Sequence, residues 1–171
     1  METLNWVPVG ERLDLLTEPV ARAVPGLPDM EVAEIDADLA DTAAFCEMYG
    51  VSLDESANCV VVAAKRGGEV RYAACMVLAT MRVDVNGVVR RHLDARRASF
   101  APMAEAVELT GMEYGGITPI GLPDGWPILV DAAVAAHPRV VVGSGVRRSK
   151  LALSGAALTG LKGAEVIDLA N

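Results

Sequence analysis

The sequence predicts a single α+β domain in which short strands and helices follow one another without a regular strand–helix alternation. Its 171 residues suffice for one core without disulfide or metal support. Hydrophobic residues make up 52% and charged residues 22%, a balance that excludes a disordered chain. Many short apolar runs are mixed with a few helical patterns, which favours α+β over repeated βαβ units.

The first third of the chain is expected to contain two helices with a strand between them. Leucines and valines over 11–24 have the spacing of an amphipathic helix, and Pro19 is expected to interrupt it. Alternating apolar and acidic residues over 30–35 predict a short strand. Asp38 as N-cap and Gly50 as C-cap delimit the second helix.

A β-hairpin is the clearest element of the middle of the chain. Two apolar runs, 58–64 and 70–78, flank a turn that contains a pair of glycines. The later expected elements are a helical segment over 82–93, a strand over 97–100, a helix over 103–110 ended by Gly111, strands over 127–131, 139–143 and 151–153, a helix capped by Ser154, and a strand over 165–169.

The formal net charge of −8 conceals an uneven distribution along the chain. Residues 1–58 carry 13 acidic and 2 basic side chains, whereas residues 59–171 carry 13 basic and 10 acidic ones. The acidic part repels polyanions, which excludes nonspecific coating of nucleic acid. A local polyanion contact fits the arginines at 90, 91, 96 and 97, or Arg147, Arg148 and Lys150, although plain surface solvation explains these charges too.

The cysteines and the N-terminus indicate a cytoplasmic protein. Cys46, Cys59 and Cys75 lie among apolar neighbours without a CxxC pair, so we expect reduced core thiols. The N-terminus lacks the basic and apolar regions of a signal peptide. Uncharged apolar stretches such as 73–79 are too short to span a bilayer, which argues against a membrane partner.

The glycine-rich segment 111–125 is the most informative stretch for function. It matches neither the GxGxxG nor the GxxxxGK[ST] phosphate-binding pattern. Its glycines and prolines instead predict a stiff loop whose N–H groups converge on a carbonyl, phosphate or oxyanion oxygen. An ordinary structural loop is an equally good interpretation of the same residues.

Other catalytic patterns are weak. His92 and His137 lack metal-ligand spacing, and core or surface roles fit both better. The aspartates at 36, 38 and 41 fit helix capping better than paired acid–base catalysis. Ser144 follows a strand in a tight turn without an evident histidine partner, so we interpret it as a binding hydroxyl.

The order of these segments resembles the YbaK/ProRS-associated domain superfamily, the prolyl-tRNA editing type of trans-acting aminoacyl-tRNA deacylases. The similarity begins near Met30 and runs to about residue 169. It rests on eight stretches, which are EVAEIDAD over 31–38, MYGVSL over 48–53, CVVV over 59–62, LTG over 109–111, GGITPIG over 115–121, PILVD over 127–131, RVVVGSG over 139–145 and KLALS over 150–154. Residues 1–29 lie outside it, so we expect an N-terminal helical extension over 1–29 and an editing domain over 30–171.

The resemblance implies a mixed, barrel-like curved β-sheet with surrounding helices and the hydrolysis of mischarged aminoacyl-tRNA. It implies a positioned water or a group of the substrate as nucleophile, and no metal or redox cofactor. The implied partner is the acceptor end of an aminoacyl-tRNA, with an aminoacyl-tRNA synthetase as a second candidate. The implied catalytic residues are Asn58, Gly116 and Thr118, and the implied substrate-binding residues are Gly115, Gly116, Ile117, Thr118, Pro119, Ile120, Gly121, Gly143, Ser144 and Gly145.

Asn58 is a departure from the family pattern, because the family usually has a lysine at this position. An asparagine offers a neutral amide where a lysine offers a positive charge. Loss of one charge-assisted contact costs about 1.5–3 kcal/mol, or roughly ten- to a hundredfold in rate. Lys65, seven residues further on, is expected in the hairpin turn and is not assigned this role.

Two functional hypotheses therefore remain open, with a third of little weight. The first is an enzyme that removes a small amino acid such as Ala, Cys, Ser or Thr from tRNA. The second is a catalytically weak or inactive module that binds tRNA ends, aminoacyl-adenosine-like ligands or a synthetase. The third is an unrelated interaction domain with a chance glycine loop. Hydrolysis distinguishes the first two hypotheses, because the binding module would show affinity without turnover.

Overall fold

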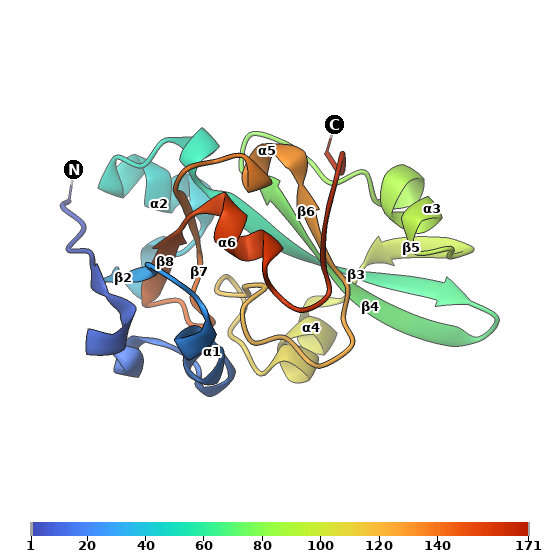
Figure 1. Ribbon diagram of the computed structural model, residues 1–171, viewed down its shortest axis with the longest axis horizontal. Helices are drawn as coiled ribbons and strands as arrows, with labels where there is room; N and C mark the ends of the chain where they lie inside the picture. Colours follow the sequence, from blue (N-terminus) through green and yellow to red (C-terminus); the bar gives the residue numbers. More distant parts are fainter. Residues whose placement is uncertain (1, 171) are drawn as a thin grey trace.

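The computed structural model describes residues 2–170, whose strands form two β-sheets flanked by short helices (Figure 1). The four-stranded sheet has the order β1-β2-β8-β7, and every neighbouring pair is antiparallel. Its strands are β1 Val7–Pro8, β2 Glu31–Glu34, β7 Val140–Gly143 and β8 Ser149–Leu153.

The five-stranded sheet is mixed and has the order β5-β3-β4-β6-β9. The strands β5, β3 and β4 are antiparallel neighbours, whereas β4, β6 and β9 run parallel. Its strands are β3 Ala57–Arg66, β4 Glu69–Leu78, β5 Arg97–Phe100, β6 Ile128–Asp131 and β9 Ala164–Ile167. The β3–β4 hairpin closes through Gly67 and Gly68, whose φ angles of 58° and 82° suit the two-residue turn that glycines favour.

The helices are short. The α-helices are α1 Glu18–Ala23, α2 Thr42–Tyr49, α3 Arg90–His92, α4 Met103–Thr110, α5 Ala132–Ala135 and α6 Gly155–Thr159. A π-helix at Val85–Val89 precedes α3, and single 3₁₀ turns are found at Val9–Glu11, Leu13–Leu15, Val24–Gly26, Ala37–Leu39 and Leu53–Glu55. None of the helices in residues 2–170 has the length and hydropathy needed to cross a membrane.

The two sheets meet where β3 begins, through a parallel bridge between Ser56 and Val141. One apolar cluster includes buried residues of both sheets, such as Met76 of β4 and Leu151 of β8. A second cluster lies between the five-stranded sheet and the Val85–Val89/α3 segment. The first cluster therefore holds the two sheets together at the junction where the site described below lies.

Most expected elements are confirmed, including the hairpin, the strand over 97–100 and the helix after Ser154. Gly50 and Gly111 both end their helices in the left-handed conformation, as predicted. A helix through 11–24 is wrong, because α1 begins at Glu18 with Pro19 in its first turn, where a missing N–H has no cost. Asp38 is not the cap of α2. Asp41 holds that place, and Asp36 accepts from the Asp38 N–H.

The expected division into an extension and a domain is not visible in the packing. Val9, Leu15, Leu16, Val20 and Val24 are buried in the same cluster as residues of β2, β6 and β8. The expected barrel-like sheet is not confirmed either, since residues 2–170 show two separate sheets and no closed barrel. What is confirmed is a mixed α+β fold.

Candidate functional site

A cavity of about 270 Å³ lies at the junction of the two sheets. The start of β3 forms one wall, the end of β7 with β8 forms another, and the N-terminus of α2 and the glycine-rich loop complete it. The lining residues that carry the argument below are Asp41, Asn58, Gly115, Ile117, Gly143 and Lys150.

Asn58 lies near the start of β3, where its side chain is held by a neighbouring helix. The Thr42 hydroxyl of α2 donates a 2.7 Å hydrogen bond to the Asn58 side-chain carbonyl. No protein acceptor within residues 2–170 is bonded to the Asn58 amide nitrogen. That nitrogen is therefore available as a neutral donor to a molecule in the cavity.

Lys150 is the one ionisable side chain among the buried residues that line this cavity in the described chain. It lies in the central strand β8, directly opposite Gly143, and only 7% of it is exposed. Its Nζ donates a 3.0 Å hydrogen bond to the Ala40 carbonyl and lies 5.3 Å from the centroid of the Phe45 ring. Among residues 2–170, no carboxylate forms an ion pair with it.

This environment changes the acidity of Lys150. Burial lowers the pKa of its ammonium to about 8, against an ordinary value of 10.5. The nearby Arg147 lowers the pKa further, whereas Cys46 and Asp41 raise it. The site thus contains a desolvated cation whose charge is incompletely balanced by protein groups, an arrangement typical of functional lysines.

The glycine-rich loop is fixed against the β7–β8 turn by close backbone contact. A methyl group on Gly116 would lie 2.7 Å from the Val146 carbonyl oxygen, and one on Gly143 would lie 2.6 Å from the Gly116 carbonyl oxygen. The Gly145 N–H donates a 2.7 Å hydrogen bond to that same Gly116 oxygen. Only glycines permit this approach, so the loop's position depends on them.

The structure brings four of the predicted site residues together, since Asn58, Gly115, Ile117 and Gly143 line the cavity. Pro119 and Gly121 line a different cavity of about 220 Å³. The remaining predicted residues contribute to packing and line neither cavity, and these are Gly116, Thr118, Ile120, Ser144 and Gly145.

The two predicted binding hydroxyls are fully buried. The Ser144 hydroxyl donates to the carbonyls of Val146 and Ser149, and it accepts a 2.7 Å hydrogen bond from the Ser149 hydroxyl. The Thr118 hydroxyl has no partner within residues 2–170. Neither group reaches the cavity in this conformation, so their predicted contact with a substrate would require a movement of the loop.

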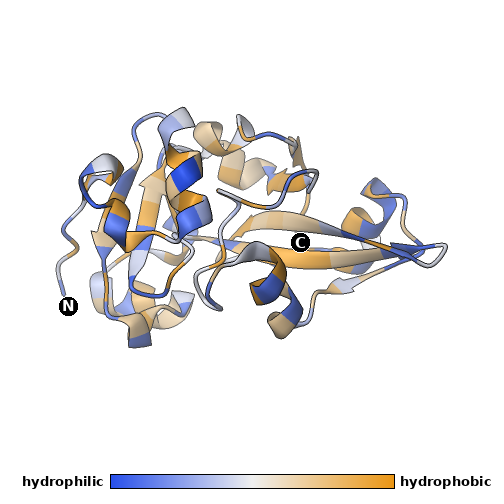
Figure 2. Cartoon of the chain, turned by 90° about the horizontal axis from the view of Figure 1, so that it is seen from below, coloured by the Kyte–Doolittle hydropathy of each residue, from blue (hydrophilic) through white to orange (hydrophobic). Residues whose placement is uncertain are grey.

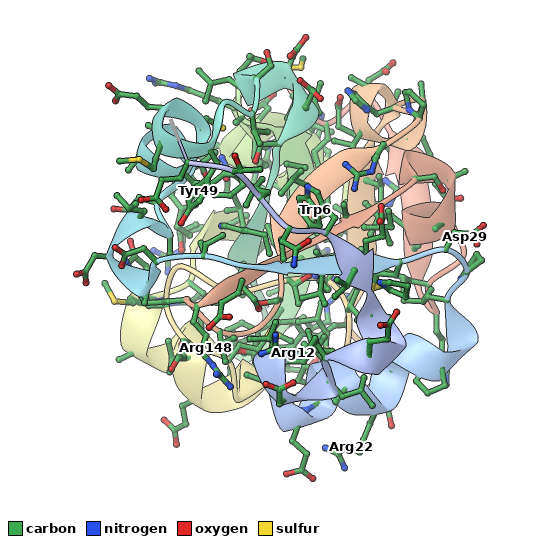
Figure 3. The ribbon with its side chains drawn as sticks, turned by 90° about the vertical axis from the view of Figure 1, so that its left-hand side faces the viewer. Trp6, Arg12, Arg22, Asp29, Tyr49 and Arg148 are labelled. Atoms are coloured by element: carbon green, nitrogen blue, oxygen red, sulfur yellow. The ribbon has the colours of Figure 1, made fainter. Side chains whose placement is uncertain are left out.

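The predicted basic group at 147–150 does not form a free surface. Arg147 donates to the carbonyls of Ala37 and Tyr114, and Arg148 donates to the Asp14 carbonyl of the N-terminal segment. Figure 3 shows Arg148 directed toward the segment that contains Arg12. The expectation of a solvated Lys150 is wrong, because β8 is buried along its length. A lysine inside the strand Ser149–Leu153, amid apolar residues, is the signal that sequence reasoning missed.

The three thiols are protonated near neutral pH, and His92 is paired at the surface. Cys46, Cys59 and Cys75 are free, and burial raises the pKa of each thiol, so that they are neutral near pH 7. His92 pairs with Glu165 on the surface at 2.9 Å. In residues 2–170, no cluster of three His, Cys, Asp or Glu side chains is arranged to hold a metal ion.

Comparison with known proteins identifies the family. Residues 36–161 match the aminoacyl-tRNA editing domain family, and the chain belongs to this family. The matched range includes Asn58, the glycine-rich loop and Lys150. No curated protein sequence matches the chain.

Solved structures show the same fold. One, described as a candidate trans-editing enzyme for prolyl tRNA synthetase, has a TM-score of 0.74 and 23% identity, with 91% of this chain and 99% of that chain covered. A hypothetical protein, APE2540, has a TM-score of 0.78 and 23% identity, with 90% of this chain and all of that chain covered. At this identity the likeness is one of fold.

Proposed function

We propose that this protein is an aminoacyl-tRNA deacylase that hydrolyses the ester of a tRNA mischarged with a small amino acid. The observation that carries the proposal is the buried Lys150, which lines the same cavity as Asn58 and the glycine-rich loop. Membership of the editing domain family supports the substrate class.

The proposed chemistry needs no protein nucleophile. The Lys150 ammonium and the N–H groups of Gly115 and Ile117, which have no protein acceptor among residues 2–170, stabilise the negative charge that develops on the ester carbonyl oxygen. A water, oriented by the Asn58 amide or by a hydroxyl of the substrate, attacks the carbonyl carbon. The ester bond to the ribose breaks, a proton passes to the ribose oxygen, and the amino acid leaves.

The Gly116 N–H, which the sequence suggested as a donor, is already bonded to the Glu113 carbonyl. We therefore assign the loop's contribution to Gly115 and Ile117, while Gly116 sets their position. Asp41 is the acidic side chain in the lining, and its carboxylate is suited to the positively charged α-amino group of an aminoacyl ester. A cavity of about 270 Å³ favours a small amino acid.

Lys150 also accounts for the departure at position 58. The family resemblance places a lysine where this chain has Asn58, and the structure has a lysine from another strand, β8, in the lining of the same cavity. We propose that the positive charge is supplied from β8 instead of β3. An active enzyme is then compatible with the asparagine.

The alternative is a module that binds a tRNA end, an aminoacyl-adenosine-like ligand or a synthetase without turnover. One structural neighbour is described as a trans-editing enzyme for prolyl tRNA synthetase, so that synthetase is the first partner to examine. Asn58 is the residue that favours this alternative.

Hydrolysis of tRNAs charged with Ala, Cys, Ser, Thr and Pro tests the proposal. We expect release of one amino acid above the buffer rate, and a loss of roughly ten- to a hundredfold in Lys150→Met. Introducing Asn58→Lys into Lys150→Met should restore part of the rate if the charge can act from either wall. No release from any substrate, together with measurable tRNA binding, would support the binding module.

A further inference from the structure

The basic side chains of this protein are concentrated at one end of the molecule. Segment 65–97 contains 8 of the 15 lysines and arginines but only 3 of the 23 acidic residues. We call these eight residues the basic end, and they are Lys65, Arg66, Arg71, Arg82, Arg90, Arg91, Arg96 and Arg97. The segment has a net charge of +5 in a protein whose remaining residues sum to −13.

The fold gathers these residues around the tip of the β3–β4 hairpin. The turn, β5 and α3 lie side by side at the right of Figure 1, away from β2, β7 and β8. In Figure 2 this end carries hydrophilic segments beyond the apolar middle of the strands. Lys65 of β3 is directly opposite Arg97 of β5, although like charges at such positions are destabilising. A bound polyanion would remove that penalty.

Several of these charges are free to bind. Lys65, Arg91, Arg96 and Arg97 are exposed, and their side chains form no hydrogen bond or ion pair within residues 2–170. By contrast, Arg66 pairs with Asp94, and Arg71 and Arg90 donate to backbone carbonyls. Asp94, one of the three acidic residues of this segment, thus already has a basic partner.

The basic end lies at a defined distance from the candidate site, because β3 connects the two. Asn58 and Lys65 are seven residues apart on this strand, which corresponds to about 23 Å at about 3.3 Å per residue. Roughly seven stacked nucleotides span this length at about 3.4 Å each. If the 3′ end of an RNA strand enters the cavity, the nucleotides about seven positions before that end lie at the basic end. In a tRNA these nucleotides belong to the paired acceptor stem.

An exposed aromatic residue lies between the two. Phe100 is 64% exposed at the end of the edge strand β5, opposite Val62. Side chains alternate along a strand, so Asn58, Val62 and Phe100 face one side of the sheet, whereas Lys65 and Arg97 face the other. An RNA strand that contacts both groups therefore passes around the edge formed by β5. Such a ring is suited to stacking on an unpaired base.

We infer that the basic end binds the paired acceptor stem of the substrate tRNA, while Phe100 stacks on a base of its single-stranded 3′ end. The choice of RNA as the polyanion rests on the proposed function. The surface itself follows from the charge distribution and the register of β3 with β5.

Binding of a tRNA acceptor-stem hairpin over a range of salt concentrations tests the inference. The triple variant Lys65→Ala, Arg96→Ala, Arg97→Ala should bind at least tenfold more weakly, and its salt dependence should be shallower by about 2–3 ions. Phe100→Ala should weaken binding about fivefold or more without changing that dependence. The control is Arg22→Ala with Lys162→Ala, two exposed basic residues outside the basic end, which should bind as the wild type does.

The activity assay separates this inference from the proposed function. If both hold, the triple variant loses rate on aminoacyl-tRNA but not on a 3′-aminoacyl-adenosine. If the wild type binds the hairpin through the basic end and hydrolyses no ester, the deacylase proposal fails and the binding surface stands. Wild-type affinity and salt dependence in the triple variant, or binding to phosphatidylserine-rich vesicles instead of RNA, would overturn the inference.

Discussion

Lys150 combines two properties that compete with each other. Its burial in β8 costs free energy, because an ammonium is removed from water and, among residues 2–170, receives only the Ala40 carbonyl and the Phe45 ring in return. The same burial strengthens its interaction with any negative charge in the cavity. Because its burial is unfavourable for folding, Lys150 is a strong candidate for direct contact with the substrate.

The pH dependence of the reaction should report on this lysine. Its pKa of about 8 means that the ammonium is present below pH 8 and is lost above it. We expect the enzyme-dependent hydrolysis rate, corrected for the uncatalysed rate, to decline as pH rises through about 8. Asp41→Asn should move this decline to lower pH, because Asp41 raises the pKa of Lys150. A rate that stays constant through pH 8 would contradict the assignment.

The free energy of unfolding should increase with pH over the range in which the hydrolysis rate declines. Between about pH 8 and 10.5, the unfolded chain holds a proton on Lys150 that the folded chain has released, so the free energy of unfolding increases with pH. The full gain is about 3 kcal/mol. Lys150→Met should be more stable than the wild type near pH 7 and should lack this increase. Urea unfolding at several pH values measures both effects.

Thr118 offers a separate test at the level of one residue. Its hydroxyl is buried without a partner, an arrangement that costs about 1–3 kcal/mol. Thr118→Val keeps the shape and removes the polar atom, so we expect stability to be equal or higher, by up to about 1 kcal/mol. If the hydroxyl also contacts the substrate, the deacylation rate falls in the same variant. An unchanged rate would remove Thr118 from the proposed site.

Among the elements, the glycine-rich loop and the β7–β8 turn act as one unit. Gly143→Ala would place a methyl group 2.6 Å from the Gly116 carbonyl oxygen and 2.7 Å from that of Ile117. The loop must then move, and we expect a loss of about 1–3 kcal/mol in stability together with a loss of hydrolysis.

The matched control for that variant is Gly10→Ala. A methyl group on Gly10 has no neighbour within 4 Å, and its φ is not positive. We expect its stability to change by less than about 0.5 kcal/mol and its activity to be unchanged. Circular dichroism during thermal unfolding, with the hydrolysis assay beside it, compares the two variants. Wild-type stability and activity in Gly143→Ala would show that the loop does not depend on this contact.

At the scale of the whole molecule, the N-terminal segment contributes apolar side chains to the core. Five of its apolar side chains are buried, and each contributes about 1.5–3 kcal/mol. Their sum is comparable to the net stability of about 5–15 kcal/mol that a domain has. A variant that lacks residues 1–24 should therefore lose cooperative unfolding. Retention of a sharp transition would support a separate extension over 1–29.

The local sequence pattern was sufficient to predict many of the helices and strands. The hairpin follows from two apolar runs around a glycine pair, and Gly50 and Gly111 end helices because glycine accepts the left-handed conformation without strain. Helix α5 and the two-residue strand β1 were missed, since neither is long enough to show a period. The expectation that Pro19 interrupts a helix was wrong, because proline is favourable in the first turn of a helix, where Pro19 lies in α1.

The site depends on contacts between residues far apart in the chain. The glycine-rich loop and Asn58 are recognisable in the sequence, because special residue types mark them. Lys150 is not, since a lysine in RRSKLAL reads as a surface group until β2 and β7 cover both edges of its strand. Its place opposite Gly143 arises from the pairing of β7 with β8, and its burial and lowered pKa arise from the packing around that pair. Short-range patterns are set by backbone preference and hydropathy, whereas the desolvation that makes a lysine reactive is a property of the packed core.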